Sequence, residues 1–182
     1  DAAALSSATT GLIFNGAFDV RENLRLDYRL EAAQQADAAN SPVNFDVDYH
    51  HAGLGITHAG WRLGWAHESL GADSSAGVAM QTPLATLHAF QGWADKFLTT
   101  PAAGMRDNQF SVSGNVAGFA MQLHHHDYQS DVSGLDYGKE WNIQLGRAIG
   151  SRYTLTAKYA RYTAEQFAQD TSKFWLMAEA RF

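Results

Sequence analysis

The sequence predicts an all-β protein, an antiparallel up-and-down transmembrane β-barrel with about nine strands in this chain. Three observations indicate this fold class. Apolar and polar residues alternate with a period of two along many short segments. The connections between those segments are alternately short and long. No apolar run approaches the roughly 18 residues of a membrane-spanning helix, although 46% of the 182 residues are hydrophobic and the mean hydropathy is −0.29.

The composition and the motif content exclude several functional classes. Cysteine is absent, which excludes disulfide bonds and thiolate metal sites. The net charge of −6 and the isoelectric point of about 5.7 argue against a nucleic-acid partner. The sequence contains no nucleophile motif, no glycine-rich phosphate loop and no zinc-protease spacing. We therefore predict that the protein is not an enzyme and needs no cofactor.

The final segment, residues 172–182, is the clearest membrane-barrel signal. One side of an extended strand there would be wholly apolar, with Phe174, Leu176, Ala178, Ala180 and Phe182. The other side would carry the charged residues Lys173, Glu179 and Arg181. Bacterial outer-membrane barrels commonly finish on such a strand with an aromatic carboxyl-terminal residue. The segment therefore predicts a bacterial outer-membrane location, with the lipid bilayer as a partner.

The first half of the chain contains four predicted strands. Residues 11–18 form the first strand and residues 24–32 the second, which is the most regular of all. In this second strand, Leu24, Leu26, Tyr28 and Leu30 alternate with Arg25, Asp27, Arg29 and Glu31. Residues 45–56 also alternate, but their apolar positions shift by one residue partway along. A β-bulge near His51 or Gly53 would absorb the shift and leave Asp46 and Asp48 on the polar side. Residues 61–68 return with Arg62 on the polar side.

Alternation resumes in the second half after residue 109. The predicted strands there cover residues 110–116, 119–126, 140–145, 153–159 and 172–182. Short turns are expected near residues 19–23, 58–60, 117–118 and 150–151, and long connections near residues 33–43, 69–107, 127–138 and 163–172. In a meander, every second connection lies at the same end. This separation is typical of outer-membrane barrels, which have short periplasmic turns and long extracellular loops.

Aromatic residues support the same interpretation, although one alternative stays open. Several fall near strand ends, where membrane barrels carry aromatic girdles: Trp61, Trp141, Tyr153, Tyr162 and Trp175. In a soluble, lipocalin-like barrel they would fill the interior instead. An odd strand number is also unusual, because bacterial single-chain barrels have even numbers. Either residues 1–10 add a strand, or residues 1–182 are one region of a larger barrel.

The connection at residues 69–107 is predicted to be an extracellular loop or a loop folded into the pore. It is too rich in apolar residues to lie bare in water: Leu84, Leu87, Phe90, Trp93, Phe97 and Leu98. Part of it has the spacing of a short amphipathic helix, with Leu87, Phe90, Ala94, Phe97 and Leu98 on one side. A loop that caps the barrel end only for stability is the alternative. If the loop narrows the pore, we expect His88, Asp95 and Lys96 to face the solute path.

Charged residues on the polar sides of the strands are the predicted pore lining. They are Arg25, Asp27, Arg29, Glu31, Asp46, Asp48, Arg62, Glu140, Lys158, Lys173, Glu179 and Arg181. His124 and His126 would point the same way in a strand and are a weak candidate for a divalent-metal site. Their position at a strand end beside a loop favours solvated side chains, so no metal is predicted.

Three stretches resemble the C-terminal part of alginate-export-family outer-membrane proteins. They are A-L-S-S-A-T-T-G at the start, the loop Q-T-P-L-A-T-L-H-A-F-Q-G-W-A-D-K-F-L-T-T-P-A-A-G-M-R-D, and the region from D-Y-G-K-E-W-N-I-Q-L to D-T-S-K-F-W-L. The resemblance implies a larger barrel, of which this chain is roughly the second half, and a polysaccharide export pore. A pore for a polyanion should be lined by arginine and lysine, whereas the polar sides here mix both signs.

The sequence therefore predicts an outer-membrane channel for polar or charged solutes, with polysaccharide export as one form of it. The alternative is a small structural or ligand-holding barrel that conducts nothing. The width of the interior separates the two, because about eight strands leave room only for packed side chains, whereas about sixteen enclose an aqueous channel.

Overall fold

The computed structural model describes residues 6–82 and 91–182. In these ranges, nine strands form one antiparallel sheet whose order in space follows the sequence. They are β1 (Ser7–Arg21), β2 (Leu24–Asp37), β3 (Asp46–His58), β4 (Trp61–Leu70), β7 (Met105–Val116), β8 (Phe119–Gln129), β9 (Asp136–Ile149), β10 (Tyr153–Ala164) and β11 (Thr171–Ala180). A second, two-stranded sheet pairs β5 (Ala72–Asp73) with β6 (Val78–Ala79). The predicted antiparallel meander is confirmed. None of the described residues belongs to a helix long and apolar enough to cross a membrane.

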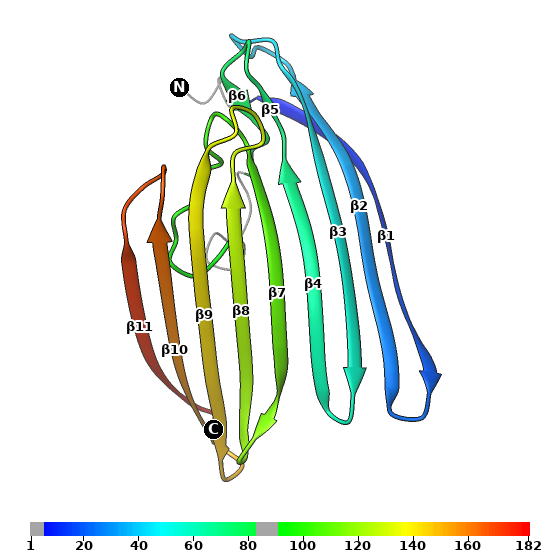
Figure 1. Ribbon diagram of the computed structural model, residues 1–182, viewed down its shortest axis with the longest axis vertical. Coiled ribbons are helices and arrows are strands. Elements are labelled where there is room, and N and C mark those ends of the chain that lie inside the picture. The colour runs from blue at the N-terminus through cyan, green and yellow to red at the C-terminus, as the bar shows by residue number, and fades with distance from the viewer. Residues whose placement is uncertain (1–5, 83–90) are drawn as a thin grey trace.

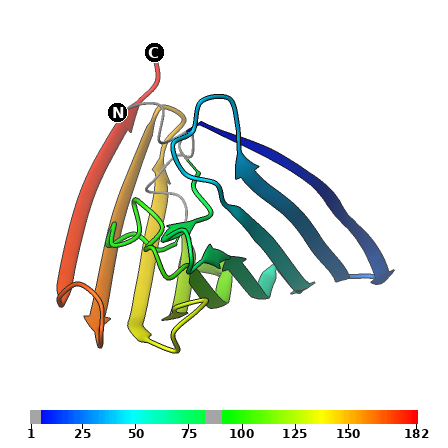
Figure 2. The same cartoon turned by 90° about the horizontal axis from the view of Figure 1, so that it is seen from above.

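The large sheet is curved into an open trough (Figure 1 and Figure 2). We call its concave side the inner face and its convex side the outer face. In the described part of the chain, β1 and β11 are the edges of the sheet and do not pair with each other. Because nine antiparallel strands alternate in direction, these two edge strands run the same way. Antiparallel closure of the barrel therefore needs an odd number of further strands.

Short turns lie at one end of the sheet, at the bottom of Figure 1. Two of them are the two-residue turns Ala59-Gly60 and Ala117-Gly118, in which both residues have positive φ. This is the backbone conformation of a type I′ turn, whose twist matches that of the strands it joins. The long connections begin and end at the other end of the sheet; their described residues are 38–45, 71–82, 91–104, 130–135 and 165–170. The predicted separation of short turns from long loops is confirmed.

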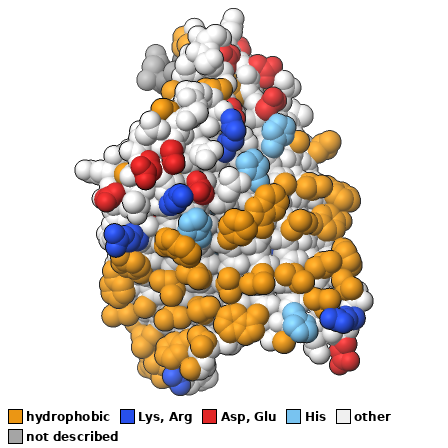
Figure 3. Space-filling view, viewed as in Figure 1, with side chains coloured by type: hydrophobic (Ala, Val, Ile, Leu, Met, Phe, Trp, Pro, Cys, Tyr) orange, Lys and Arg blue, Asp and Glu red, His pale blue; other side chains and the backbone are white. Residues whose placement is uncertain are grey.

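The outer face is apolar over most of the length of the strands. Its large side chains are well exposed; for example, Leu12 is 82% exposed, Phe110 58% and Leu176 73%. Figure 3 shows these side chains as a broad band below a polar region near the loop end. A soluble barrel would turn its apolar side inward, away from water. The lipocalin-like alternative is therefore not favoured.

A small hydrophobic core lies on the inner face, near the loop end. Its buried members are Phe45, Val47, Leu70, Met80, Ala94, Phe97, Met105, Tyr128, Tyr137, Ala160 and Tyr162. Phe97, from the long loop, occupies its centre, with its ring centroid 4.6 Å from that of Tyr128 and 5.3 Å from that of Phe167. The loop between β4 and β7 therefore packs inside the trough, as Figure 2 shows for the segment after residue 90.

One expectation about local structure is wrong, and another fails in the part of it that the structure describes. The β-bulge expected near His51 or Gly53 is absent, because β2 and β3 pair without a register shift from one end to the other. No helix forms over residues 91–100. Positive φ angles at Gln91, Gly92 and Asp95 break any helical run there. Leu84, Leu87 and Phe90, which belonged to the same expected helix, lie outside the described residues.

The two faces of the sheet can be distinguished by placing arginine on each. Leu26 points to the outer face, whereas Ala17 lies opposite Asp27 on the inner face. If the outer face meets lipid, Leu26→Arg should lower the free energy of unfolding by about 2–4 kcal/mol near the bilayer midplane. Ala17→Arg, beside a carboxylate and water, should change it little. Denaturant unfolding in lipid vesicles measures both, and equal losses would contradict the assignment of the faces.

Candidate functional site

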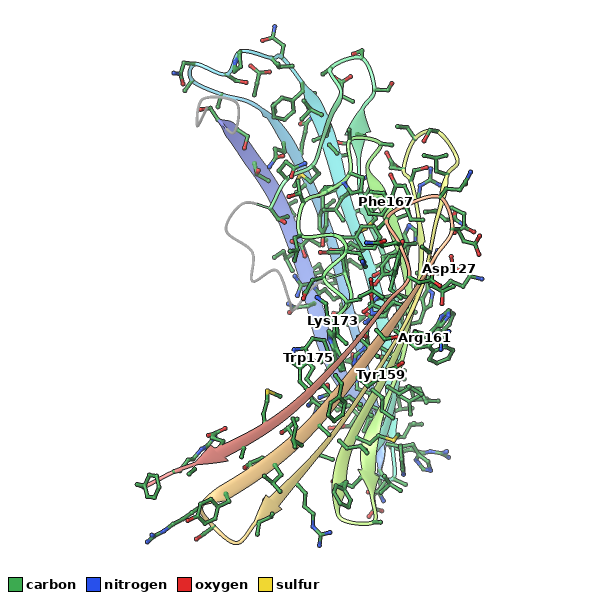
Figure 4. All side chains as sticks on the ribbon, turned by 90° about the vertical axis from the view of Figure 1, so that its left-hand side faces the viewer. Asp127, Tyr159, Arg161, Phe167, Lys173 and Trp175 are labelled. Atoms are coloured by element: carbon green, nitrogen blue, oxygen red, sulfur yellow. The ribbon has the colours of Figure 1, made fainter. Side chains whose placement is uncertain are left out.

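Most of the predicted pore-lining residues share the inner face. Strand register places nine of them there: Arg25, Asp27, Arg29, Glu31, Arg62, Glu140, Lys158, Lys173 and Glu179. Figure 4 shows Lys173 and Trp175 on the concave side of β10 and β11, with Asp127 and Arg161 on the opposite side. Arg181 lies beyond β11, and its guanidinium Nε is 2.6 Å from a carboxylate oxygen of Glu179.

The expectation fails for Asp46 and Asp48, which lie on the outer face. Their cross-strand partners are Ala36 and Gln34, and the Gln34 amide donates a hydrogen bond to Asp46 (2.9 Å). The two faces exchange polarity at the loop end of β3. Val47 faces inward and packs in the core beneath the long loop, while the aspartates point outward. This exchange produced the apparent shift in the sequence pattern.

The long loop is attached to the inner face through Glu140. One carboxylate oxygen of this buried side chain accepts hydrogen bonds from the backbone N–H groups of Trp93 (2.5 Å) and Ala94 (2.8 Å). The preceding Gly92 has φ +84°, and a Cβ atom there would collide with Glu140 and with the hydroxyl of Tyr128. A glycine is therefore needed for the loop to approach the wall this closely.

Two lysines on the neighbouring strands β10 and β11 contact the same segment. Lys173 Nζ is 2.6 Å from a carboxylate oxygen of Asp95. Lys158 Nζ lies 4.1 Å from the ring centroid of Trp93 and 5.5 Å from that of Trp175, so it links loop and wall through cation–π contacts. The predicted constriction residue Asp95 is thus placed at the wall.

Of the other two predicted constriction residues, Lys96 is described by the structure and His88 is not. Lys96 Nζ lies 5.8 Å from the ring centroid of Tyr162, on the inner face. His88 lies outside the described residues. Near the start of the loop, hydrogen bonds from the Ser75 hydroxyl and the backbone N–H of Ala76 lower the pKa of Asp73, and these bonds stabilise the turn between β5 and β6.

An ion pair crosses three strands lower on the inner face. Arg62 on β4 reaches Asp27 on β2 through two hydrogen bonds, of 3.1 Å from Nε and 2.5 Å from Nη2. The guanidinium passes over Gly55 on the intervening strand β3, where any Cβ would collide with both partners. Gly64 gives the same clearance on β4. The glycines therefore let a long cation lie flat on the wall.

The predicted pore lining left out several polar residues that lie on the inner face, among them Glu68, Asp107 and Gln109. The Glu68 carboxylate accepts hydrogen bonds from the Tyr49 hydroxyl (2.6 Å) and the Gln91 amide (2.7 Å). With neighbours such as Arg29 and His51, these groups line a polar pocket of about 160 Å³ between wall and loop. Their alternation with the outward-facing aromatic residues Trp65 and Phe110 was a signal that could have placed them.

The two histidines of the weak metal candidate do share the inner face. A ring nitrogen of His126 is 2.7 Å from an Asp107 oxygen, and the Gln109 amide lies 2.9 Å from His124 Nδ1. No cluster of three or more metal-ligating side chains occurs in the described ranges.

Comparison with known proteins identifies solved structures that have a similar fold. No protein-family model and no curated protein matches the sequence significantly. The structure is similar to that of the outer membrane protein OprD from Pseudomonas aeruginosa (TM-score 0.71, 11% sequence identity), covering 96% of this chain and 52% of that one. It is also similar to Acinetobacter baumannii OccAB2 (TM-score 0.69, 14% identity), covering 96% of this chain and 48% of that one. The chain thus spans about half the length of these structures.

These matches correct the family suggested by the sequence. The assignment to the alginate-export family is wrong, because the structural neighbours, OprD and OccAB2, belong to a different outer-membrane barrel family. Strands of alternating polarity and a long apolar loop occur in outer-membrane barrels of different families. A resemblance in such segments therefore does not distinguish one barrel family from another. The nine-stranded sheet has the fold of part of a bacterial outer-membrane β-barrel.

Proposed function

We propose that this chain forms part of the wall of an outer-membrane channel that passes polar or charged solutes. The apolar outer face contacts lipid, the short turns face the periplasm, and the long connections face outward. The polar inner face lines the aqueous path. The fold shared with OprD and OccAB2 and the opposite polarity of the two faces support this proposal.

In this proposal, the long loop narrows the channel. The observation that carries this step is the hydrogen bonding of Glu140 to the backbone N–H groups of Trp93 and Ala94. A buried carboxylate holds backbone donors through charge-assisted hydrogen bonds, which are stronger than neutral ones. The contact between Lys173 and Asp95 acts on the same segment. The loop is therefore fastened to the wall over a short stretch, as a fixed constriction requires.

The charge pattern supports passage of polar solutes of either sign. Arg62 is paired with Asp27, and Arg29 with Glu31, so neither wall cation stands without a carboxylate. Paired charges attract solutes of one sign less strongly than a cluster of like charges would. Selectivity in this part of the wall then depends on keeping each pair intact.

The first functional prediction concerns attachment of the loop. Glu140→Ala removes the acceptor of two charge-assisted hydrogen bonds, each contributing about 1.5–3 kcal/mol. The loop should then detach in part, and single-channel conductance in planar bilayers should become larger and noisier. Glu140→Gln keeps a carbonyl acceptor and should have a smaller effect. The recordings should use the complete native polypeptide.

Glu179→Gln is the matched control for this experiment. Glu179 is also on the inner face, but its carboxylate bonds to Arg181 beyond the end of β11 and not to the loop. Channels that carry Glu179→Gln should have the single-channel conductance of the wild type. If folded, inserted Glu140→Ala channels conduct like the wild type, the loop is only a cap.

The second functional prediction concerns the ion pair between β2 and β4. Asp27→Asn leaves Arg62 without its counter-ion and should shift the channel toward anions. Arg62→Gln leaves Asp27 alone and should shift it toward cations. The reversal potential under a salt gradient measures both, at about 0.1 M salt, where the Debye length is about 10 Å. The double variant should return near the wild-type value, and shifts of the same sign in both single variants would contradict a water-filled path along this wall.

A further inference from the structure

Two basic side chains stand together on the outer face, near the loop end of β9 and β10. In the register of this strand pair, Arg161 lies opposite Trp141, and Lys139 lies two residues before Trp141. The two cations are therefore diagonal neighbours, with Cα atoms roughly 7–8 Å apart. Figure 4 shows Arg161 on the side of the sheet opposite to Lys173. The pair thus faces away from the channel interior.

Aromatic side chains lie directly below these cations. Trp141 is 52% exposed on the outer face, and its ring centroid is 4.4 Å from that of His125. Tyr159, two residues from Arg161 on the same face, is 37% exposed. Large aromatic residues at the edge of an apolar band mark the depth of the lipid headgroups. Given the membrane placement of the proposed function, Lys139 and Arg161 stand at headgroup depth.

Asp127 is the acid that shares the outer face with these two cations, because it lies opposite Lys139 in the pairing of β8 with β9. Lys139 Nζ lies 3.6 Å from a carboxylate oxygen of Asp127, a loose contact between side chains that are 54% and 33% exposed. Arg161 forms no ion pair with any residue that the structure describes, and its side chain is exposed. The nearby Asp170 and Asp136 accept hydrogen bonds from the backbone N–H groups of Ala164 and Gly138. These hydrogen bonds hold the two carboxylates in place without removing their negative charges.

We propose that Lys139 and Arg161 bind a phosphate group of a lipid A-type glycolipid in the outer leaflet. The guanidinium can bind two phosphate oxygens at once, and the ammonium adds a second positive charge beside it. The acyl chains of the same lipid would lie on the apolar band below, beside Tyr159 and Ile143. Trp141 and Tyr159 would then lie between the phosphate group and the acyl chains of the lipid. The site is thus a lipid-binding surface distinct from the solute path.

Native mass spectrometry of the complete polypeptide in detergent tests this proposal. The probe is diphosphorylated lipid A, compared with monophosphorylated lipid A and with phosphatidylglycerol. Lys139→Gln and Arg161→Gln should each lower the affinity for diphosphorylated lipid A about fivefold, as expected for one basic side chain near a lipid surface. The double variant should lose more than either single one.

Arg147→Gln is the matched control. Arg147 is also on the outer face of β9, but near the turn end, where its guanidinium lies 5.0 Å from the ring centroid of Phe119. Its affinity for lipid A should stay at the wild-type level. An equal loss in this control, or wild-type affinity in the double variant, would overturn the site. Equal binding of phosphatidylglycerol would overturn the assignment to a lipid A-type glycolipid.

The same samples separate failure of this site from failure of the proposed function. Double-variant protein that inserts into planar bilayers and conducts like the wild type, with reduced lipid A binding, supports both proposals. Normal conductance with unchanged lipid A binding overturns only the lipid site. Wild-type protein that remains in the aqueous phase during detergent phase separation would overturn the membrane placement on which both proposals rest.

Discussion

Backbone hydrogen bonding is the constraint on which this structure depends. Within a bilayer no water is present to satisfy N–H and C=O groups, so a spanning sheet must pair every strand on both sides. The nine-stranded meander meets this requirement for its seven inner strands, while β1 and β11 present free edges in the described part of the chain. With the backbone satisfied within the sheet, side chains can divide by solvent. Apolar residues face outward, and polar residues face the trough.

The sequence was sufficient to predict the strands, the order of short and long connections, and most of the inner face. A period of two assigns each residue to a face wherever one face stays apolar. The assignment of faces from this period failed at Asp46 and Asp48, because it assumes that the same face is apolar along the whole strand. Once β3 rises above the apolar band, its inner face packs against the loop and its outer face meets water.

The role of Glu140 could not be predicted from local pattern. Its position among inward-facing polar residues was evident, but its partners are backbone groups of Trp93 and Ala94, far away in the sequence. A backbone donor carries no sequence signature, and the irregular loop that presents it depends on positive φ at Gly92 and its neighbours. In the described part of the expected helix, Phe97 packs instead among the tyrosines of the wall. Tertiary packing overrides periodicity in such a segment.

The shared direction of β1 and β11 limits how a barrel of this kind can arise by duplication. Two tandem copies of this nine-stranded sheet that both kept their long loops at the same end would bring a last strand beside a first strand that runs the same way. Their seam would be parallel, and a parallel seam needs a crossover connection, which a short turn cannot supply. Gain or loss of a single strand removes the conflict. Units with an even number of strands, such as hairpins, can be repeated with all their long loops at one end, whereas nine strands can be repeated antiparallel only if the second copy is inverted.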